Sequence, residues 1–257
     1  MNTNLRIVSL VPSITELLYD LGLEEQVVGI TKFCVHPNHW FRSKTRIGGT
    51  KNIAVDKIRS LSPNLVIASK EENIKEQIEA IAPFTEVLLT DVKNLDDALA
   101  MIQTIGEKTN TSEKANIITQ KIKNNFSSLG ALRHRSYALG NPKLKVCYLI
   151  WKDPYMTVGA DTFIHDMLSH CGFENAFVNQ LRYPSITMDD ILTVSPSHLF
   201  LSSEPYPFSE KHIEALQKEF PSTNIQLVDG EYFSWYGSRL MDAATYFKTL
   251  IRQTIVL

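Results

Sequence analysis

The segment VDKIRSLSPNLVIASKE at residues 55–71 recurs as MDDILTVSPSHLFLSSE at residues 188–204, in the same order and without a gap. The identical positions of this repeat are Asp56/Asp189, Ile58/Ile191, Ser62/Ser195, Pro63/Pro196, Ser69/Ser202 and Glu71/Glu204. The match continues with small insertions, since VLLTD at 87–91 corresponds to IQLVD at 225–229. We therefore expect two related α/β lobes with a ligand cleft between them.

The composition excludes several classes of protein. The 257 residues carry a formal net charge of −2, and no basic patch of the kind that binds nucleic acid stands out. No apolar run approaches the roughly 18–20 residues of a transmembrane helix, so we do not expect the chain to span a membrane. The cysteines Cys34, Cys147 and Cys171 give no disulfide framework, although a single disulfide stays open.

The N-terminal segment bears on location. Residues 7–21 are fairly apolar but include Pro12, Glu16 and Asp20, and no small-residue cleavage site follows a basic start. We therefore expect either that the chain stays in the cytoplasm or that an export signal has been removed.

Short β-rich runs alternate with helical patterns, which predicts parallel sheets flanked by helices. Strands are expected at 6–10, 27–30, 65–69, 86–90, 145–150, 199–202 and 225–229. Helices are expected at 13–22, 55–61, 73–81, 96–106, 162–171, 188–194, 209–219 and 239–252. Ser13 and Glu16 have the spacing of a capping box for the first helix, and residues 31–52 read as a loop.

Residues 112–133 break this alternation. Apolar residues there repeat at three- and four-residue spacing along one stripe, and about 21 helical residues span roughly 30 Å. Because the segment falls between the repeats, we interpret it as a rigid helix that joins the lobes. The expected organisation is an N-terminal lobe at 1–110, a linking helix and connector at 111–142, and a C-terminal lobe at 143–257.

Aromatic residues gather in loops that follow predicted strands, and ligands of open α/β sheets bind at the carboxyl ends of strands. The candidate ligand contacts of this kind are Trp40, Trp151, Trp235, Tyr155, Tyr206 and Tyr236. Aromatic faces suit a large, flat or partly apolar ligand. The alternative is that the tryptophans fill gaps between loops and core.

The densest cluster of potential metal ligands is Cys34, His36 and His39 in one loop. Cys34 and His36 are candidate ligand contacts, and His36 could bind a transition metal or place an axial ligand on a metal-centred macrocycle. The alternative for His36 is an ordinary loop histidine, and His39 is expected at the surface. A metal-dependent enzyme that uses Cys34, His36 and nearby carboxylates is the second function to weigh. Neither a phosphate-binding glycine loop nor a G-x-S-x-G nucleophile elbow occurs in the sequence.

Charged residues also follow several strands. Glu71, Glu204 and Asp153 are expected to face a ligand, although the two glutamates could instead cap the helices near residues 73 and 209. Arg239 could reach an anionic ligand or a nearby carboxylate.

Asp56 and Asp189 occupy equivalent positions at the starts of two short helices, where a carboxylate is favourable. They also form a pair of acidic knobs on the two lobes. A partner built of two like subunits, with an arginine on each, could receive both.

The order of these features resembles the helical-backbone substrate-binding proteins of ABC importers, which are receptors for vitamin B12, ferric siderophores and haem. The resemblance is strongest to the vitamin B12 branch. It rests on RIVSLVPSITELLYDLGL, RIGGTKNIAVDKIRSLSPNLVIAS, the long inter-lobe helix, MTVGADTFIHDMLSHCGFENAF and SITMDDILTVSPSHLFLSS.

The resemblance implies two lobes joined by a rigid helix, with a corrinoid, ferric siderophore or haem held by loops at the strand ends. It implies binding without catalysis and without an intrinsic cofactor. It also implies that Asp56 and Asp189 dock onto arginines of a dimeric permease, and that the protein works in the periplasm or cell envelope. A cytoplasmic cofactor carrier on the same scaffold is the third function to weigh.

Overall fold

The computed structural model describes residues 5–138 and 143–254, which form two compact units. The first unit contains the chain up to Val92 together with Asp96–Lys121 and Trp235–Leu240. The second contains Lys93–Leu95, Ile122–Ser234 and the chain from Met241 onward. This division differs from the expected lobes in three respects, of which the first is that Lys93–Leu95 belongs to the second unit. The long helix contributes to both units, and a short segment near the C-terminus belongs to the first.

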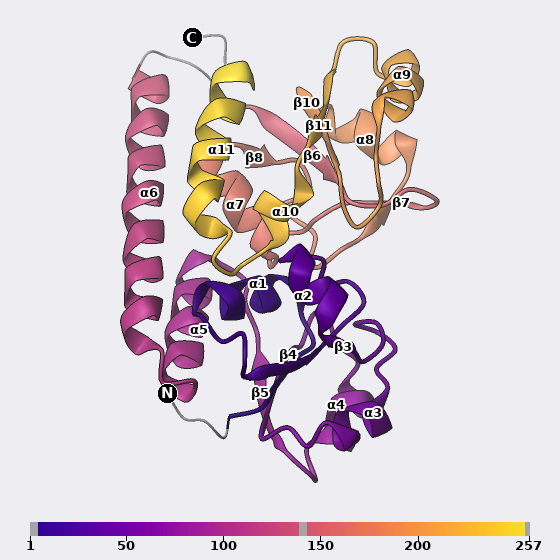
Figure 1. Cartoon of the computed structure of the whole chain (residues 1–257). Coiled ribbons are helices and arrows are strands. Elements are labelled where there is room, and N and C mark those ends of the chain that lie inside the picture. The colour runs from indigo at the N-terminus through magenta and orange to yellow at the C-terminus, as the bar shows by residue number, and fades with distance from the viewer. Residues whose placement is uncertain (1–4, 139–142, 255–257) are drawn as a thin grey trace. The chain divides into compact units, whose positions relative to one another are not determined.

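The first unit is built on a parallel sheet with strand order β3-β2-β1-β4-β5 (Figure 1). Its strands are β1 (Ile7–Ser9), β2 (Val27–Ile30), β3 (Thr45–Arg46), β4 (Leu65–Ser69) and β5 (Glu86–Thr90). Every residue of β1 and β4 is buried, as expected for central strands covered by helices on both faces. The strands predicted at 27–30, 65–69 and 86–90 are confirmed.

Helices connect these strands. They are α1 (Pro12–Asp20), α2 (Asn38–Ser43), α3 (Val55–Ser60), α4 (Lys75–Ile81) and α5 (Leu95–Lys108). Residues 31–52, which we expected to be loop throughout, therefore contain α2 and β3. The two elements are too short for hydrophobic periodicity to reveal them.

The start of α1 differs from the predicted capping box. The helix begins at Pro12 after Val11, and no side chain caps it. Proline suits the first helical position because it lacks the N–H group that would need a partner there. The capping box at Ser13 and Glu16 is therefore wrong, and the Glu16 carboxylate is engaged elsewhere.

The second unit is built on a parallel sheet with strand order β11-β10-β6-β8. Its strands are β6 (Lys145–Leu149), β8 (Glu174–Asn175), β10 (His198–Ser202) and β11 (Asn224–Val228). A separate antiparallel pair consists of β7 (Tyr155–Met156) and β9 (Ser185–Ile186). The two-residue strands β7, β8 and β9 were not predicted, because two residues show no periodicity.

Helices of the second unit confirm most of the predicted ranges. They are α7 (Phe163–Cys171), α8 (Met188–Val194), α9 (Glu210–Glu219), α10 (Gly230–Ser234) and α11 (Leu240–Thr254). Thr162 caps the start of α7, and Gly172 ends it in the left-handed region at φ 85°, as predicted from its position. The short helix α10 was not predicted.

The long helix α6 (Ser112–Ala138) is continuous and extends beyond its predicted end at residue 133. Its 27 residues correspond to about 40 Å. Within the second unit Phe126 of α6 packs edge-on against His170 of α7 and Phe247 of α11, at centroid distances of 5.2 and 6.2 Å. Residues 139–142, which belong to the expected linking helix and connector at 111–142, lie outside the described structure. Over the described ranges, no helix has the length and apolar character needed to cross a membrane.

Hydrogen bonds recur in the two units together with the sequence repeat. The Asn64 N–H donates to the Arg6 carbonyl at 3.0 Å, and the Ser197 N–H donates to the Lys145 carbonyl at 2.9 Å. The Thr85 hydroxyl donates to the Pro63 carbonyl, and the Thr223 hydroxyl donates in the same way to the Pro196 carbonyl. Ser62 and Ser195 both have a left-handed backbone, with φ of 46° and 45°. The repeat therefore has the same local backbone structure in both units.

Candidate ligand-binding residues

Both sheets have a point at which the strand order reverses. In the first unit β1 is followed by β2 on one side and pairs with β4 on the other. In the second unit β6 pairs with β8 on one side and β10 on the other. Ligands of open α/β sheets bind outside the carboxyl ends of the strands at such points. The loops after β1, β4, β6 and β10 are therefore the positions at which ligand contacts are expected.

In the second unit, aromatic residues meet at this point. Trp151 follows β6 and Tyr206 follows β10, and their rings pack edge-to-face with centroids 5.6 Å apart. The Tyr206 N–H donates to the carbonyl of Ile150 at 3.4 Å, which ties the two loops together. Trp151 stays 40% exposed. The structure thus brings together two predicted contacts and leaves one indole available to a ligand.

Phe208 and His212 pack behind Tyr206. Their ring centroids lie 4.7 and 5.5 Å from that of Tyr206, and 5.4 Å from each other. We call Trp151, Tyr206, Phe208 and His212 the aromatic patch. Phe208 and His212 were not among the predicted site residues. The spacing of Ser209 and His212 was an available signal, because these residues form the capping box of α9.

The loop after β6 also carries polar groups. Lys152 Nζ lies 2.7 Å from Asp153 Oδ2, so the predicted ligand contact Asp153 already has a partner. Asp153 itself has a left-handed backbone with φ 65°, which is uncommon for a residue other than glycine. Tyr155 begins β7 and is half-buried, and this burial raises the pKa of its phenol.

Glu204, at the end of β10, is held by its own unit. Its carboxylate accepts a hydrogen bond from the Ser234 hydroxyl, and its backbone carbonyl accepts one from Ser202 at 2.6 Å. Ser209 and His212 form the cap of α9, so the alternative role of Glu204 as that cap is wrong.

In the first unit a second cluster forms around Trp235. The His36 ring lies edge-on to Trp235 with centroids 5.6 Å apart, and the Arg239 guanidinium lies over the indole at 4.7 Å. Arg239 also donates two hydrogen bonds to the Glu16 carboxylate, at 2.6 and 3.0 Å. We call His36, Trp235, Arg239 and Glu16 the Trp235 cluster. Glu16 is the nearby carboxylate predicted as one partner of Arg239, and contact of Arg239 with an anionic ligand stays a prediction.

Opposing effects act on the pKa of Glu16 in this cluster, and the effect of burial is the larger. Burial raises the pKa of the Glu16 carboxyl, while Arg239 and, less strongly, His36 act to lower it. A bidentate guanidinium–carboxylate pair has a fixed geometry, so the Glu16 carboxylate holds the Arg239 guanidinium in a defined position over the Trp235 ring. Gly237 lets the backbone of this segment lie close to Ser13, because a Cβ there would lie 2.5 Å from the Ser13 carbonyl oxygen.

The predicted contact Tyr236 and the neighbouring Glu72 lie near the carboxyl end of β4 in the first unit. Burial raises the pKa of the Tyr236 phenol, and the carboxyl of Glu72 adds to the effect. Burial also raises the pKa of Glu72, with Glu71 acting in the same direction and Lys51 in the opposite one. Tyr236 is almost completely buried.

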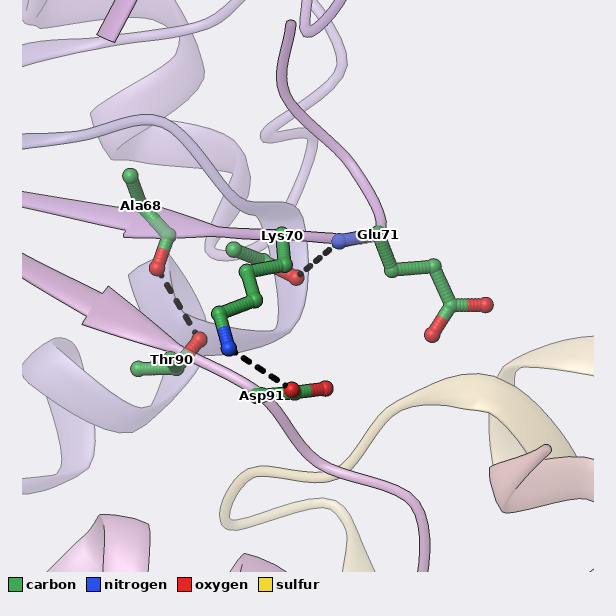
Figure 2. A network of polar contacts seen from close by, with 6 residues as sticks. Ala68, Lys70, Glu71, Thr90 and Asp91 are labelled. Carbon is green, nitrogen blue, oxygen red and sulfur yellow. Dashed lines mark hydrogen bonds and ion pairs between the residues drawn. The ribbon is translucent and has the colours of Figure 1, made fainter. Parts of the chain in front are cut away.

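Glu71 lies at the carboxyl end of β4 in a small polar network. Its N–H donates to Ser69 Oγ at 3.2 Å. Figure 2 shows its carboxylate pointing away from the neighbouring pair of Lys70 and Asp91. Lys70 Nζ lies 2.9 Å from Asp91 Oδ2. The residue that precedes α4 is Ile74 and makes no side-chain cap, so the alternative role of Glu71 as that cap is wrong.

Cys34 and Trp40 do not have the exposure expected of ligand contacts. Both side chains are fully buried. The Cys34 thiol lies 3.0 Å from Thr15 Oγ1 and 3.1 Å from Thr31 Oγ1, and burial raises its pKa, which opposes formation of a metal-binding thiolate. Trp40 packs against the ring of Tyr19 with centroids 5.6 Å apart. For Trp40 the alternative interpretation, a tryptophan that fills the core, fits the structure.

The arrangement of potential metal ligands bears on the role predicted for His36. Across residues 5–138 and 143–254 no group of three or more His, Cys, Asp or Glu side chains is arranged to hold a metal ion. His36 lies on the Trp235 ring, and His39 lies 3.4 Å from Glu24 with both side chains about half exposed. All three cysteines are free and buried.

Asp56 and Asp189 are exposed in the first turns of α3 and α8, as predicted. Their neighbours differ. Asp190 accepts hydrogen bonds from Thr187 at 2.7 and 2.8 Å and completes the capping box of α8, whereas α3 has no side-chain cap.

Two α/β units, each with a parallel sheet and with aromatic and charged loops at its strand ends, give this chain the fold of solved periplasmic binding proteins. The sequence matches the family described as periplasmic binding protein over residues 7–224, and the chain belongs to that family.

Relatives of known name support the same class. The chain is 24% identical to a vitamin B12-binding protein of Pectobacterium carotovorum over 242 residues, which are 93% of this chain and 85% of the relative. It is 30% identical to an ABC transporter substrate-binding lipoprotein of Bacillus subtilis over 198 residues, which are 74% of this chain and 61% of that protein. Among solved structures, a periplasmic haem-binding protein of Roseiflexus in its apo form matches with a TM-score of 0.81 at 21% identity. That match covers 97% of this chain and 98% of the other and supports the fold.

Proposed function

We propose that this chain is the ligand receptor of an ABC importer for a metal-bearing chelate, which is a corrinoid, a haem or a ferric siderophore. The contacts of the ligand are assigned first to the aromatic patch of the second unit. The Trp235 cluster of the first unit is a separate candidate surface. Binding involves no reaction, because affinity comes from aromatic contact and a few polar anchors.

The observation that carries this proposal is the exposed Trp151 ring at the reversal of strand order between β6 and β10. Tyr206 packs edge-on against it, so the indole is held in place before a ligand arrives. An aromatic surface of this kind suits a macrocycle or a flat chelate. Relatives named for vitamin B12 and haem binding support the same ligand class.

The ligand test is a fluorescence titration of the purified chain. Cyanocobalamin, haemin, a ferric hydroxamate and a ferric catecholate are added separately, and quenching of tryptophan emission is followed. We expect saturable binding of at least one chelate at micromolar concentration or below. A chain that binds none of the four, but hydrolyses a model ester in the presence of added metal, would favour the metal-dependent enzyme instead.

We also propose that Asp56 and Asp189 dock the chain onto the permease. Both are exposed at matched positions of the repeat, and no partner of either carboxylate occurs in the described parts of the chain. A permease dimer with an arginine on each subunit provides the complementary charge. The envelope location that this role requires is tested by fractionating cells that express the full-length gene.

The docking test uses proteoliposomes that contain the importer's permease and ATPase. Asp56→Lys and Asp189→Lys are expected to reduce stimulation of ATP hydrolysis while leaving chelate affinity unchanged. Asp20→Lys, on the exposed end of α1, makes the same charge change as a control. Equal stimulation by all three variants would reject the docking role.

A further inference from the structure

His212 is the member of the aromatic patch that packs against Tyr206 and Phe208, and both of its ring nitrogens have partners. Nδ1 accepts a hydrogen bond from the Ser209 N–H at 2.9 Å and lies 3.1 Å from Ser209 Oγ. Nε2 lies 3.3 Å from the hydroxyl oxygen of Tyr206, at the long end of hydrogen-bond distances. His212 is almost completely buried in this position.

These contacts determine the protonation of the ring. A backbone N–H can only donate, so Nδ1 of His212 must carry a lone pair. A neutral imidazole with an unprotonated Nδ1 carries its proton on Nε2. The Nε2–H therefore donates to the Tyr206 oxygen rather than accepting from it.

The direction of this bond determines what Tyr206 can do. Because its oxygen accepts from His212, the Tyr206 O–H is free to donate elsewhere. Within the described residues no acceptor for this proton lies at hydrogen-bond distance. Trp151 flanks the same tyrosine ring, so the donor lies beside the exposed indole.

We propose that His212 is a positioning residue that fixes the Tyr206 hydroxyl as a hydrogen-bond donor to an acceptor oxygen on the rim of the bound chelate. The acceptor is a carboxylate or amide carbonyl at the ligand periphery, while the apolar face of the ligand covers Trp151. This inference rests on the proposed function. It adds a polar anchor to a surface that is otherwise aromatic.

The binding test uses two variants that separate helix capping from the tyrosine contact. His212→Gln keeps an acceptor at the usual third position of a capping box but removes the imidazole from Tyr206. Tyr206→Phe removes only the hydroxyl. Each variant is expected to weaken binding of haemin or cyanocobalamin by about three- to tenfold, the range of one neutral hydrogen bond. The double variant should lose no more affinity than the weaker-binding single variant, since both substitutions act on the same hydrogen bond from Tyr206 to the ligand.

His198→Gln provides the matched control. His198 belongs to the same unit, but it lies at the amino end of β10 and contacts Ser197. Its substitution should leave chelate affinity unchanged. Thermal unfolding of each variant checks that a loss of binding does not come from a loss of fold.

The pH dependence of affinity provides a readout that simple packing would not change. Protonation of His212 places a proton on Nδ1 and removes the acceptor for the Ser209 N–H. Burial is the largest cause that lowers the pKa of His212, and the charged groups Lys211 and Lys152 lower this pKa further. Affinity of the parent chain should therefore fall only at a pH below the ordinary titration range of histidine, and His212→Gln should remove that part of the pH profile.

Nitrogen-15 NMR of the ligand-free full chain tests the protonation state independently of any ligand. We expect His212 to have a protonated Nε2 and an unprotonated Nδ1 at neutral pH. The opposite tautomer overturns the inference whether or not a chelate binds. If the parent chain binds a chelate and both variants bind it equally well, the inference fails and the proposed function stands. If the parent binds none of the four chelates, the proposed function fails, and the ligand part of the inference fails with it.

Discussion

Replacement of Trp151 by alanine is the most direct test of the aromatic patch. A tryptophan side chain buries about 150–250 Å² when fully covered. Trp151 is 40% exposed, so a covering ligand removes on the order of 60–100 Å² of its surface from water. At about 25 cal/mol per Å² this burial contributes about 1.5–2.5 kcal/mol to binding. Trp151→Ala should therefore raise the Kd about ten- to sixtyfold.

The assay is a titration with the chelate that the parent chain binds, followed by the absorbance of the chelate because the variant lacks one fluorophore. Leu192→Ala is the matched control. Leu192 is a 56% exposed apolar residue of the same unit, but it lies in α8 rather than at the carboxyl end of a strand. An unchanged Kd for Trp151→Ala, or an equal loss for both variants, would refute the assignment of the patch as a ligand surface.

Three further predictions concern stability and pH. Arg239→Met leaves the Glu16 carboxylate unpaired, and because the side chains of the pair are only 15% and 19% exposed, the free energy of unfolding in urea should fall by about 2–3 kcal/mol. Gly237→Ala should cost about 1–3 kcal/mol, because the new methyl group meets the Ser13 carbonyl and residues 235–240 must shift. Asp190→Asn should lower the Tm at pH 7 but not at low pH. Hydrogen bonds from Thr187 lower the pKa of Asp190 below its ordinary 3.8, so the stabilisation is present above that pH and is lost as the carboxylate protonates. A Tm difference that grows as the pH falls would contradict this sign.

The fold could be predicted from the sequence where burial leaves a local pattern. The strands VVGI at 27–30 and LVIAS at 65–69 are short apolar runs ended by turn residues, and both are found as predicted. The left-handed end of α7 at Gly172 follows from the residue type alone. Features of this kind depend on neighbours in the chain, so the sequence shows them directly.

Long-range contacts explain why the start of α1 and the role of Glu16 were mispredicted. The spacing of Ser13 and Glu16 indicated a local cap, but Glu16 pairs with Arg239, which lies 223 positions away. No local pattern reports such a partner. The tertiary contact therefore overrides the local preference, as it often does for helix ends.

The sequence identified some of the residues that meet at the strand ends of the second unit and missed others, and their role in ligand binding stays a prediction. Trp151 and Tyr206 were selected because they follow strands, and the structure brings their rings together. Trp40 was selected by the same rule and is buried, because the unpredicted helix α2 places it in the core. His212 was missed because histidine is not one of the residues usually expected to complete a capping box.

The matched hydrogen bonds of the two units have a consequence for how this receptor can diversify. They lie at the amino ends of the strands, where Asn64 and Ser197 make the same backbone contact. At the carboxyl ends the copies have diverged, since Ser69 Oγ accepts from a backbone N–H whereas Ser202 Oγ donates to a carbonyl. The amino-end rims of the two sheets therefore share their hydrogen bonds, whereas the carboxyl-end rims differ. Under the proposed function, exchange of the carboxyl-end loops should change ligand specificity while the opposite rim is left intact.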